Sequence, residues 1–264
     1  MPDRSRRLFL TLSALGTFSG TPASAQAQPR DRRPLSEPPR VAADPAVIDS
    51  GLAARWQAAM SRDLGWSARF EPLASSQILD QLERGDIDVG VFLSHPKAEH
   101  LDKQGLIYER HSIARTEVLL IGPAQDPAGI RSESDAGRAL TQIIAAAGAG
   151  QANWTQPAAG SPLAALADAL TSGLASKGLS AAAPRAVAGP AYQLMTRLEW
   201  NRKGASAGTK VWPLKDPRLV LDLQTALSFR SRHSAGKLLV TWLQWPIAQG
   251  IVGKAQPVWQ RIKP

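Results

Sequence analysis

Short apolar runs alternate, from Val41 onward, with stretches in which apolar residues recur at helical spacing. The apolar runs are rich in Val, Ile and Leu, a composition typical of buried strands. We expect strands or extended segments at 68–73, 88–93, 116–121, 210–214 and 219–229. Strands that alternate with helices are typical of a mostly parallel sheet with helices on both faces. The pattern therefore predicts an α/β fold.

Helices are expected where a capping residue precedes apolar residues spaced three or four positions apart. The clearest case begins at Ser161-Pro162, where Leu163, Leu166 and Leu170 follow at this spacing. The other predicted helices cover 51–61, a stretch ending at Gly85, a stretch after the cap Ser94, 134–147 with Ser134 as cap, 189–200, and 236–244 before Pro246.

The first 25 residues have the pattern of an export signal. A twin-arginine stretch at 5–10 (SRRLFL) leads into an apolar run at 8–18, and 23–25 (ASA) has the form of a cleavage site. The apolar run is too short to span a membrane, which takes about 20 residues. We therefore expect a cleaved signal at 1–25 and a periplasmic protein, exported by the twin-arginine or the general route. The Pro-rich, charged stretch at 26–40 is expected to be a disordered linker.

Composition and motifs exclude several classes of protein. The 264 residues include 31 Lys and Arg, 22 Asp and Glu, four His and no Cys, for a formal net charge of +9. The absence of Cys excludes a disulfide framework and a cysteine nucleophile. Much of the positive charge lies in 1–40, so the charge does not indicate a nucleic-acid partner. Motifs of serine hydrolases, zinc proteases and P-loop enzymes are missing, and His95 and His100 are wrongly spaced for one helical face. We expect neither enzymatic activity nor a metal or other cofactor.

Four stretches resemble the tungstate-binding component of bacterial ABC transporters, which is a type II periplasmic binding protein. They are 49–52 (DSGL), 85–89 (GDIDV), 95–99 (HPKAE) and 121–130 (IGPAQDPAGI), and the last is the most specific. Weaker matches are 191–194 (AYQL) and 216–219 (DPRL), and together the matches extend the resemblance over about 41–249.

The resemblance implies a two-lobed α/β fold with a hinge of two crossing strands, at 116–122 and 219–229. Lobe one would comprise 41–121 and the returning segment 224–264, and lobe two would comprise 122–223. A solute would bind between the lobes, as in other hinge-bending proteins.

The resemblance also implies that an oxyanion is held by hydroxyl groups, helix N-termini and an arginine. Two of the family's binding loops are changed here. The hydroxyl-rich turn before the first helix has become 43–46 (ADPA), which contains Asp44 and lacks Ser and Thr. In the loop 154–161 (WTQPAAGS), Thr155 takes the place of the arginine and Trp154 that of a serine.

The remaining candidates for ligand contact are hydroxyl-bearing or aromatic residues in these regions. Each also has an alternative, purely structural role. The serines Ser50, Ser75, Ser76 and Ser161 could serve as helix caps without contacting a ligand, and Trp154 and Thr155 could serve in packing the loop. Asp44 would suit either a solvated turn or a cationic ligand. The predicted ligand-binding residues are Ser50, Ser75, Ser76, Trp154, Thr155 and Ser161.

The sequence thus predicts a monomeric, exported solute-binding protein of an ABC uptake system. It would capture a small oxyanion of the tungstate or molybdate type and deliver it to a permease in the inner membrane. The altered loops leave a second hypothesis: a divergent module that has lost tight oxyanion binding and serves another ligand, sensing or protein interaction. A hydrolase on the same scaffold is disfavoured by the missing motifs.

Overall fold

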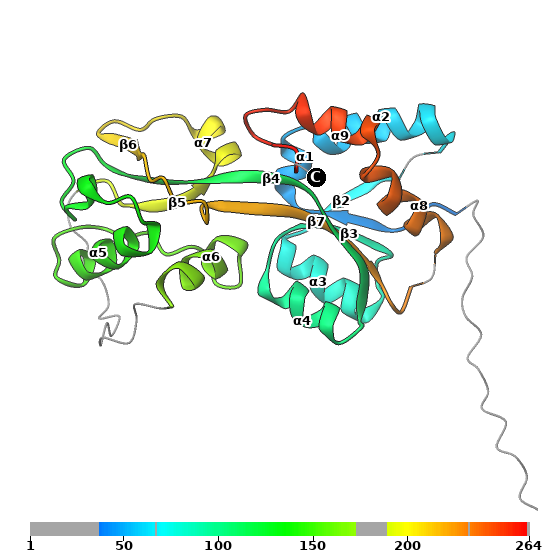
Figure 1. Cartoon of the computed structure of the whole chain (residues 1–264), viewed down its shortest axis with the longest axis horizontal. Helices are drawn as coiled ribbons and strands as arrows, with labels where there is room; N and C mark the ends of the chain where they lie inside the picture. The colour runs from blue at the N-terminus through cyan, green and yellow to red at the C-terminus, as the bar shows by residue number, and fades with distance from the viewer. Residues whose placement is uncertain (1–36, 67, 173–188, 232, 263–264) are drawn as a thin grey trace, which may run out of the picture. The chain divides into compact units, whose positions relative to one another are not determined.

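The computed structural model describes residues 37–66, 68–172, 189–231 and 233–262, which belong to one compact unit (Figure 1). The predicted signal at 1–25 and most of the predicted linker lie outside the described residues. The last linker residues are attached to the fold, because the Arg40 amide donates to Asp88 Oδ2 at 2.6 Å and His233 Nε2 lies 2.7 Å from the Glu37 carbonyl oxygen.

The described elements alternate between strands and helices as the sequence predicts. The strands are β1 (Val41–Ala43), β2 (Phe70–Pro72), β3 (Val89–Leu93), β4 (Ile107–Pro123), β5 (Gln193–Thr196), β6 (Thr209–Trp212) and β7 (Val220–Ser228). The helices are α1 (Pro45–Asp49), α2 (Leu52–Leu64), α3 (Ser75–Arg84), α4 (Pro96–Lys103), α5 (Ala136–Gly148), α6 (Pro162–Thr171), α7 (Arg197–Lys203), α8 (Ser234–Leu243) and α9 (Pro246–Gly253), with a 3-10 turn η1 (Ile130–Ser132).

The strands run in the order β2-β1-β3-β7-β4-β5, and β6 pairs with the last part of β4 on the edge opposite β5. Among the described strands, the pairings of β1 with β2 and with β3 are parallel, and the four other pairings are antiparallel. The expectation of a mostly parallel sheet is therefore wrong. Strand direction depends on how the chain returns to the sheet, and local hydrophobic patterns do not record it.

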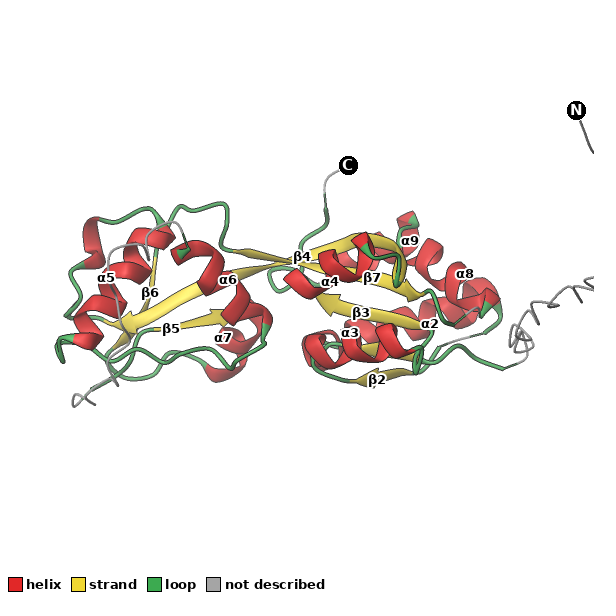
Figure 2. Ribbon diagram, turned by 90° about the horizontal axis from the view of Figure 1, so that it is seen from below, coloured by secondary structure: helices red, strands yellow, loops and turns green. Residues whose placement is uncertain are grey.

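The two long strands β4 and β7 connect two groups of elements (Figures 1 and 2). The first part of β4 pairs with β7, from Ile107 opposite Ser228 to Glu117 opposite Val220, and its last part pairs with β5 and β6. We call β1, β2, β3 and helices α1 to α4, α8 and α9 the first lobe, and β5, β6 and α5 to α7 the second lobe. This is the expected two-lobed arrangement with two crossing strands.

The strands of both lobes nevertheless form one hydrogen-bonded path, because β4 belongs to both. The predicted lobe boundaries, between 121 and 122 and between 223 and 224, fall inside the continuous strands β4 and β7. Those boundaries stay a prediction, because no break in hydrogen bonding marks them.

Several helix ends differ from the sequence prediction. Ser161 caps α6 as expected, with its Oγ accepting from the Ala164 amide at 3.1 Å. The cap of α4 is His95, not Ser94, and the cap of α5 is Asp135, not Ser134. The helix expected at 189–200 is wrong. Residues 193–196 form β5, whose alternating burial packs Leu194 against the core beside Leu120 on β4.

Candidate functional site

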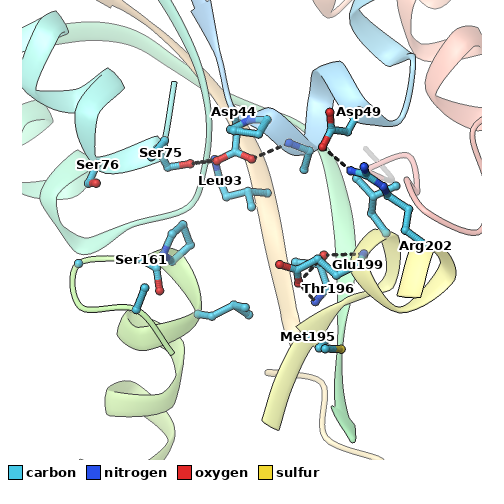
Figure 3. Close-up of a pocket in the computed structure, with 18 of the residues that line it drawn as sticks. Asp44, Asp49, Ser75, Ser76, Leu93, Ser161, Met195, Thr196, Glu199 and Arg202 are labelled. Atoms are coloured by element: carbon cyan, nitrogen blue, oxygen red, sulfur yellow. Dashed lines mark hydrogen bonds and ion pairs between the residues drawn. The ribbon is translucent and has the colours of Figure 1, made fainter. Parts of the chain in front are cut away.

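A pocket of about 780 Å³ lies where residues of the two lobes meet (Figure 3). The first lobe contributes Asp44, Pro45, Ala46, Asp49, Ala74, Ser75, Ser76 and Leu93. The second lobe contributes 158–163, Met195, Thr196, Leu198, Glu199, Arg202 and Lys203. The volume lies within the range of about 300–1,000 Å³ that is usual for small-molecule sites. This pocket is therefore the candidate binding site.

Asp44 is the central polar residue of the first-lobe wall. It follows β1 and caps α1, with its Oδ1 accepting from the Ala46 amide at 2.9 Å. Its Oδ2 accepts from the Ser75 hydroxyl at 2.6 Å, and the Ser75 Oγ in turn accepts from the Leu93 amide at 2.9 Å. Asp44 is only 8% exposed. The carboxylate thus joins the starts of α1 and α3 to the end of β3.

Opposing effects act on the Asp44 carboxyl. Burial raises its pKa, and the nearby Glu199 adds to that rise. The hydrogen bonds from Ser75 and Ala46 favour the charged form and lower the pKa, but the net shift is upward. The site therefore keeps a partly desolvated acidic group where the resemblance implies a hydroxyl-rich turn.

The second-lobe wall is built by β5 and α7. Thr196 and Glu199 form a capping box, in which Glu199 Oε2 accepts from the Thr196 amide at 2.7 Å and the Thr196 hydroxyl at 2.9 Å. One turn further, Arg202 forms an ion pair with Asp49 of the first lobe. Lys203 completes the charged residues of this wall.

The N-terminus of α6 borders the same pocket. Pro162 has no N–H, and Ser161 already takes the Ala164 amide, so the Leu163 amide is the first-turn donor that lacks an intrahelical partner. Ser76, across the pocket on α3, has no hydrogen-bond partner for its hydroxyl within the described part of the chain (Figure 3). These two groups are uncharged donors that the pocket offers to a ligand.

The pocket brings together three of the six predicted site residues, Ser75, Ser76 and Ser161. The hydroxyls of Ser75 and Ser161 already hold internal hydrogen bonds. Ser76 is therefore the best placed of the predicted residues, and its contact with a ligand stays a prediction.

The other three predicted residues do not line the pocket. Ser50 Oγ donates to the Val47 carbonyl and accepts from Trp259 Nε1 at 2.8 Å. Trp154 Nε1 donates to the Gln156 side chain, and the Thr155 amide donates to the Tyr192 carbonyl at 2.8 Å. Trp154 and Thr155 lie beside Tyr192, just before β5, and only the later part of the loop, from 158, lines the pocket.

Sequence reasoning missed Glu199, Arg202 and Met195. The T-x-x-E pattern of the capping box at 196–199 was visible in the sequence. Taking 189–200 as one helix concealed it, because this places Thr196 inside the helix instead of at its start.

The part of the chain that the structure describes contains neither a metal-binding cluster nor a membrane-spanning helix. It holds no group of three or more His, Asp or Glu side chains arranged to bind a metal ion. None of the described helices has the length and apolar character needed to cross a membrane.

Comparisons with known proteins agree with this fold. Residues 42–255 match the family of bacterial extracellular solute-binding proteins, and the chain belongs to that family. A comparison with curated protein sequences finds no match.

Solved structures with the same fold share little sequence with this chain. The tungstate-binding protein TupA from Desulfovibrio alaskensis G20 superposes with a TM-score of 0.67 at 15% identity, covering 86% of this chain and 100% of TupA. The tungstate ABC transporter protein from Geobacter sulfurreducens gives 0.63 at 17% identity, covering 83% and 99%. A substrate-binding protein from Clostridium perfringens, solved with bound phosphate, gives 0.55 at 14% identity, covering 85% and 99%. These likenesses establish the type II periplasmic binding protein fold.

Proposed function

We propose that this chain is the exported, solute-capturing component of an ABC uptake system and that it binds its solute in the pocket between the two lobes. The observation that carries the proposal is the pocket itself. Residues of α1 and α3 form one wall, and residues of the α6 loop, β5 and α7 form the other, in a chain of the solute-binding family. A permease in the inner membrane would receive the solute.

The first candidate ligand is an oxyanion of the tungstate or molybdate type. The structural neighbours that bind tungstate or phosphate support it. So do the N-termini of α3 and α6, because a helix N-terminus favours negative charge. Against it, the Asp44 carboxylate already binds at the start of α3, and Arg202 is paired with Asp49. We therefore expect at most weak tungstate binding.

The second candidate is a different solute, and the position of Asp44 favours it. A buried carboxylate on the pocket wall repels a dianion and attracts a cation or a hydrogen-bond donor. The pocket is also much larger than a single tetrahedral oxyanion, so it suits an organic molecule better. Of the two ligand classes, the geometry favours this one.

The test is a thermal-shift panel on the exported chain with tungstate, molybdate, sulfate, phosphate and small organic acids and amines. A ligand held at 100 times its dissociation constant should stabilise the fold by about 2.7 kcal/mol. We expect stabilisation by an organic solute and little or none by tungstate. Nanomolar tungstate affinity would refute this ranking of ligands, and failure of every solute class would contradict solute capture itself.

A further inference from the structure

We propose that the solute carries a protonated amine, which binds between Asp44 and Glu199, and an apolar body, which packs on Leu93, Leu163 and Met195. This inference rests on the proposed function, since it names the ligand class of the same pocket. The pocket, not the acidic residues alone, defines the site.

The first step concerns the start of α3. The N-terminus of a helix attracts an anion, and here the protein's own Asp44 carboxylate supplies it, accepting from the hydroxyl of Ser75, the first residue of α3. An external anion would have to displace Asp44 or lie against it. A carboxylate oxygen can accept more than one hydrogen bond, so Asp44 keeps acceptor capacity for a donor in the pocket.

The second step concerns Glu199 on the opposite wall. Figure 3 shows Asp44 at the start of α1 and Glu199 on α7, both bordering the pocket. Glu199 is near enough to raise the pKa of Asp44 by charge repulsion. Its capping bonds both go to Oε2, and Oε1 has no hydrogen-bond partner within the described residues. An ammonium group that donates to Asp44 would also be attracted across the pocket by the charge of Glu199.

The third step is the charge balance of the lining. Three carboxylates, Asp44, Asp49 and Glu199, face two cations, Arg202 and Lys203. Arg202 is engaged by Asp49, which leaves the pair Asp44 and Glu199 opposed by Lys203 alone. The lining therefore carries a net negative charge and selects against inorganic dianions.

The fourth step is the apolar part of the wall. Leu93 at the end of β3, Leu163 in the first turn of α6, and Met195 on β5 all line the cavity. Apolar side chains with a few convergent polar groups are the usual lining of sites for organic molecules, and Met adapts to ligands of different shape. An alkyl or aryl amine satisfies both parts of the pocket.

The experiment uses three probes that share a phenyl group and a short alkyl chain. Phenethylamine carries a cation, 3-phenylpropionate an anion, and phenylalanine both charges. Binding to the exported chain is measured by calorimetry at low ionic strength. We expect phenethylamine to bind and 3-phenylpropionate not to bind at the same concentrations. Phenylalanine shows whether the amine-bearing solute also has a carboxylate.

Variants identify the groups that bind the amine. Asp44→Asn should weaken phenethylamine binding roughly 10- to 100-fold, because a hydrogen bond to a buried charge is lost. Glu199→Gln should weaken it about fivefold, because Glu199 is exposed and screened. The Gln side chain can still accept the capping bonds of α7, so this variant remains decisive if Asp44→Asn fails to fold.

The matched control is Asp168→Asn, which removes one negative charge from α6 outside the pocket lining and should leave affinity unchanged. The amine proposal is overturned if 3-phenylpropionate binds and phenethylamine does not, or if Glu199→Gln and Asp168→Asn behave alike. In either of these cases solute capture itself still stands. It fails only if every probe here and every member of the thermal-shift panel leaves the protein unaffected.

Discussion

At the residue scale, Asp44 and Ser75 determine the character of the pocket. Ser75 lies 31 positions after Asp44, and its hydroxyl both donates to the Asp44 carboxylate and accepts from the Leu93 amide. This short chain of bonds orders three segments of the first lobe around one buried charge. It also converts two residues of an expected oxyanion site into a self-contained acidic wall.

Ser75 and Ser76 provide a matched pair for testing this role. Ser75→Ala removes a donor from the buried Asp44 carboxylate and an acceptor from the Leu93 amide, so it should lower the free energy of unfolding by about 1–3 kcal/mol. Ser76→Ala removes a hydroxyl for which the described residues provide no partner, and should change it by less than about 0.5 kcal/mol. Urea unfolding measures both, and equal effects would contradict the proposed division of roles.

At the element scale, contacts between turns that are far apart in the sequence stabilise the second lobe. Asp216, in the turn before β7, accepts from the Ala136 amide at the first turn of α5 at 2.8 Å and from the Arg218 side chain. The Arg218 guanidinium and the backbone hydrogen bonds hold the pKa of Asp216 well below its usual range. Its side chain is only 4% exposed, so the charge is satisfied almost entirely by the protein.

Asp216 should therefore contribute to acid sensitivity. A carboxyl whose pKa is lowered by folding stabilises the native state above its ordinary pKa of 3.8, and this contribution is lost as pH falls below that value. Asp216→Asn should lower the free energy of unfolding at pH 7 by about 1–3 kcal/mol. The difference from the wild type should shrink between about pH 4 and pH 2. Urea titrations across this range test it, and a difference that does not vary with pH would contradict the ionic role.

Gly122, near the end of β4, packs closely against aromatic side chains of the second lobe. A Cβ atom there would collide with the ring of Tyr192, and its ideal position is 3.0 Å from Trp212 Nε1. Gly148, the last residue of α5, has open space around the same position. This close packing explains why β4 carries a glycine at this position.

The two glycines should respond to alanine with opposite signs. Gly122→Ala should destabilise the protein by about 1–3 kcal/mol, because it overpacks the core beside Tyr192. Gly148→Ala should stabilise it by up to about 1 kcal/mol, because alanine is the better helix former. Thermal unfolding of both variants provides the measurement. A neutral Gly122→Ala would show that the Tyr192 ring moves freely.

At the scale of the whole molecule, β4 and β7 make the two lobes one structure. A single hydrophobic cluster extends from Trp56 and Trp242 in the first lobe through Val118 and Leu120 on β4 to Leu140 on α5. The Asp49–Arg202 ion pair adds a contact between the lobes, although both side chains are exposed and the pair is expected to contribute little to stability.

This continuity predicts cooperative unfolding of both lobes. Tryptophan fluorescence, which samples Trp56 and Trp242 in the first lobe and Trp212 in the second, should change at the same urea concentration as the far-UV circular dichroism. Two separated transitions would show that the lobes fold independently, with β4 and β7 acting only as linkers.

Local signals in the sequence determined much of the element list. Ser161 before Pro162 fixed the start of α6, and Gly85, which has a positive φ of 82°, fixed the end of α3. These signals succeed because capping and chain reversal involve residues that are near in sequence. The family resemblance supplied the two-lobed fold with its pair of crossing strands.

Only the tertiary structure decided the strand directions and the chemistry of the pocket. Ser50 and Ser75 look like ligand donors in the sequence, but Trp259 and Asp44, far away along the chain, already use their hydroxyls. Glu199 and Arg202 reach the pocket because 193–196 is a strand and not part of a helix. Hydrophobic periodicity records which face of an element is buried. It does not record which distant side chain meets that face, and that pairing determines which polar groups remain available to a ligand.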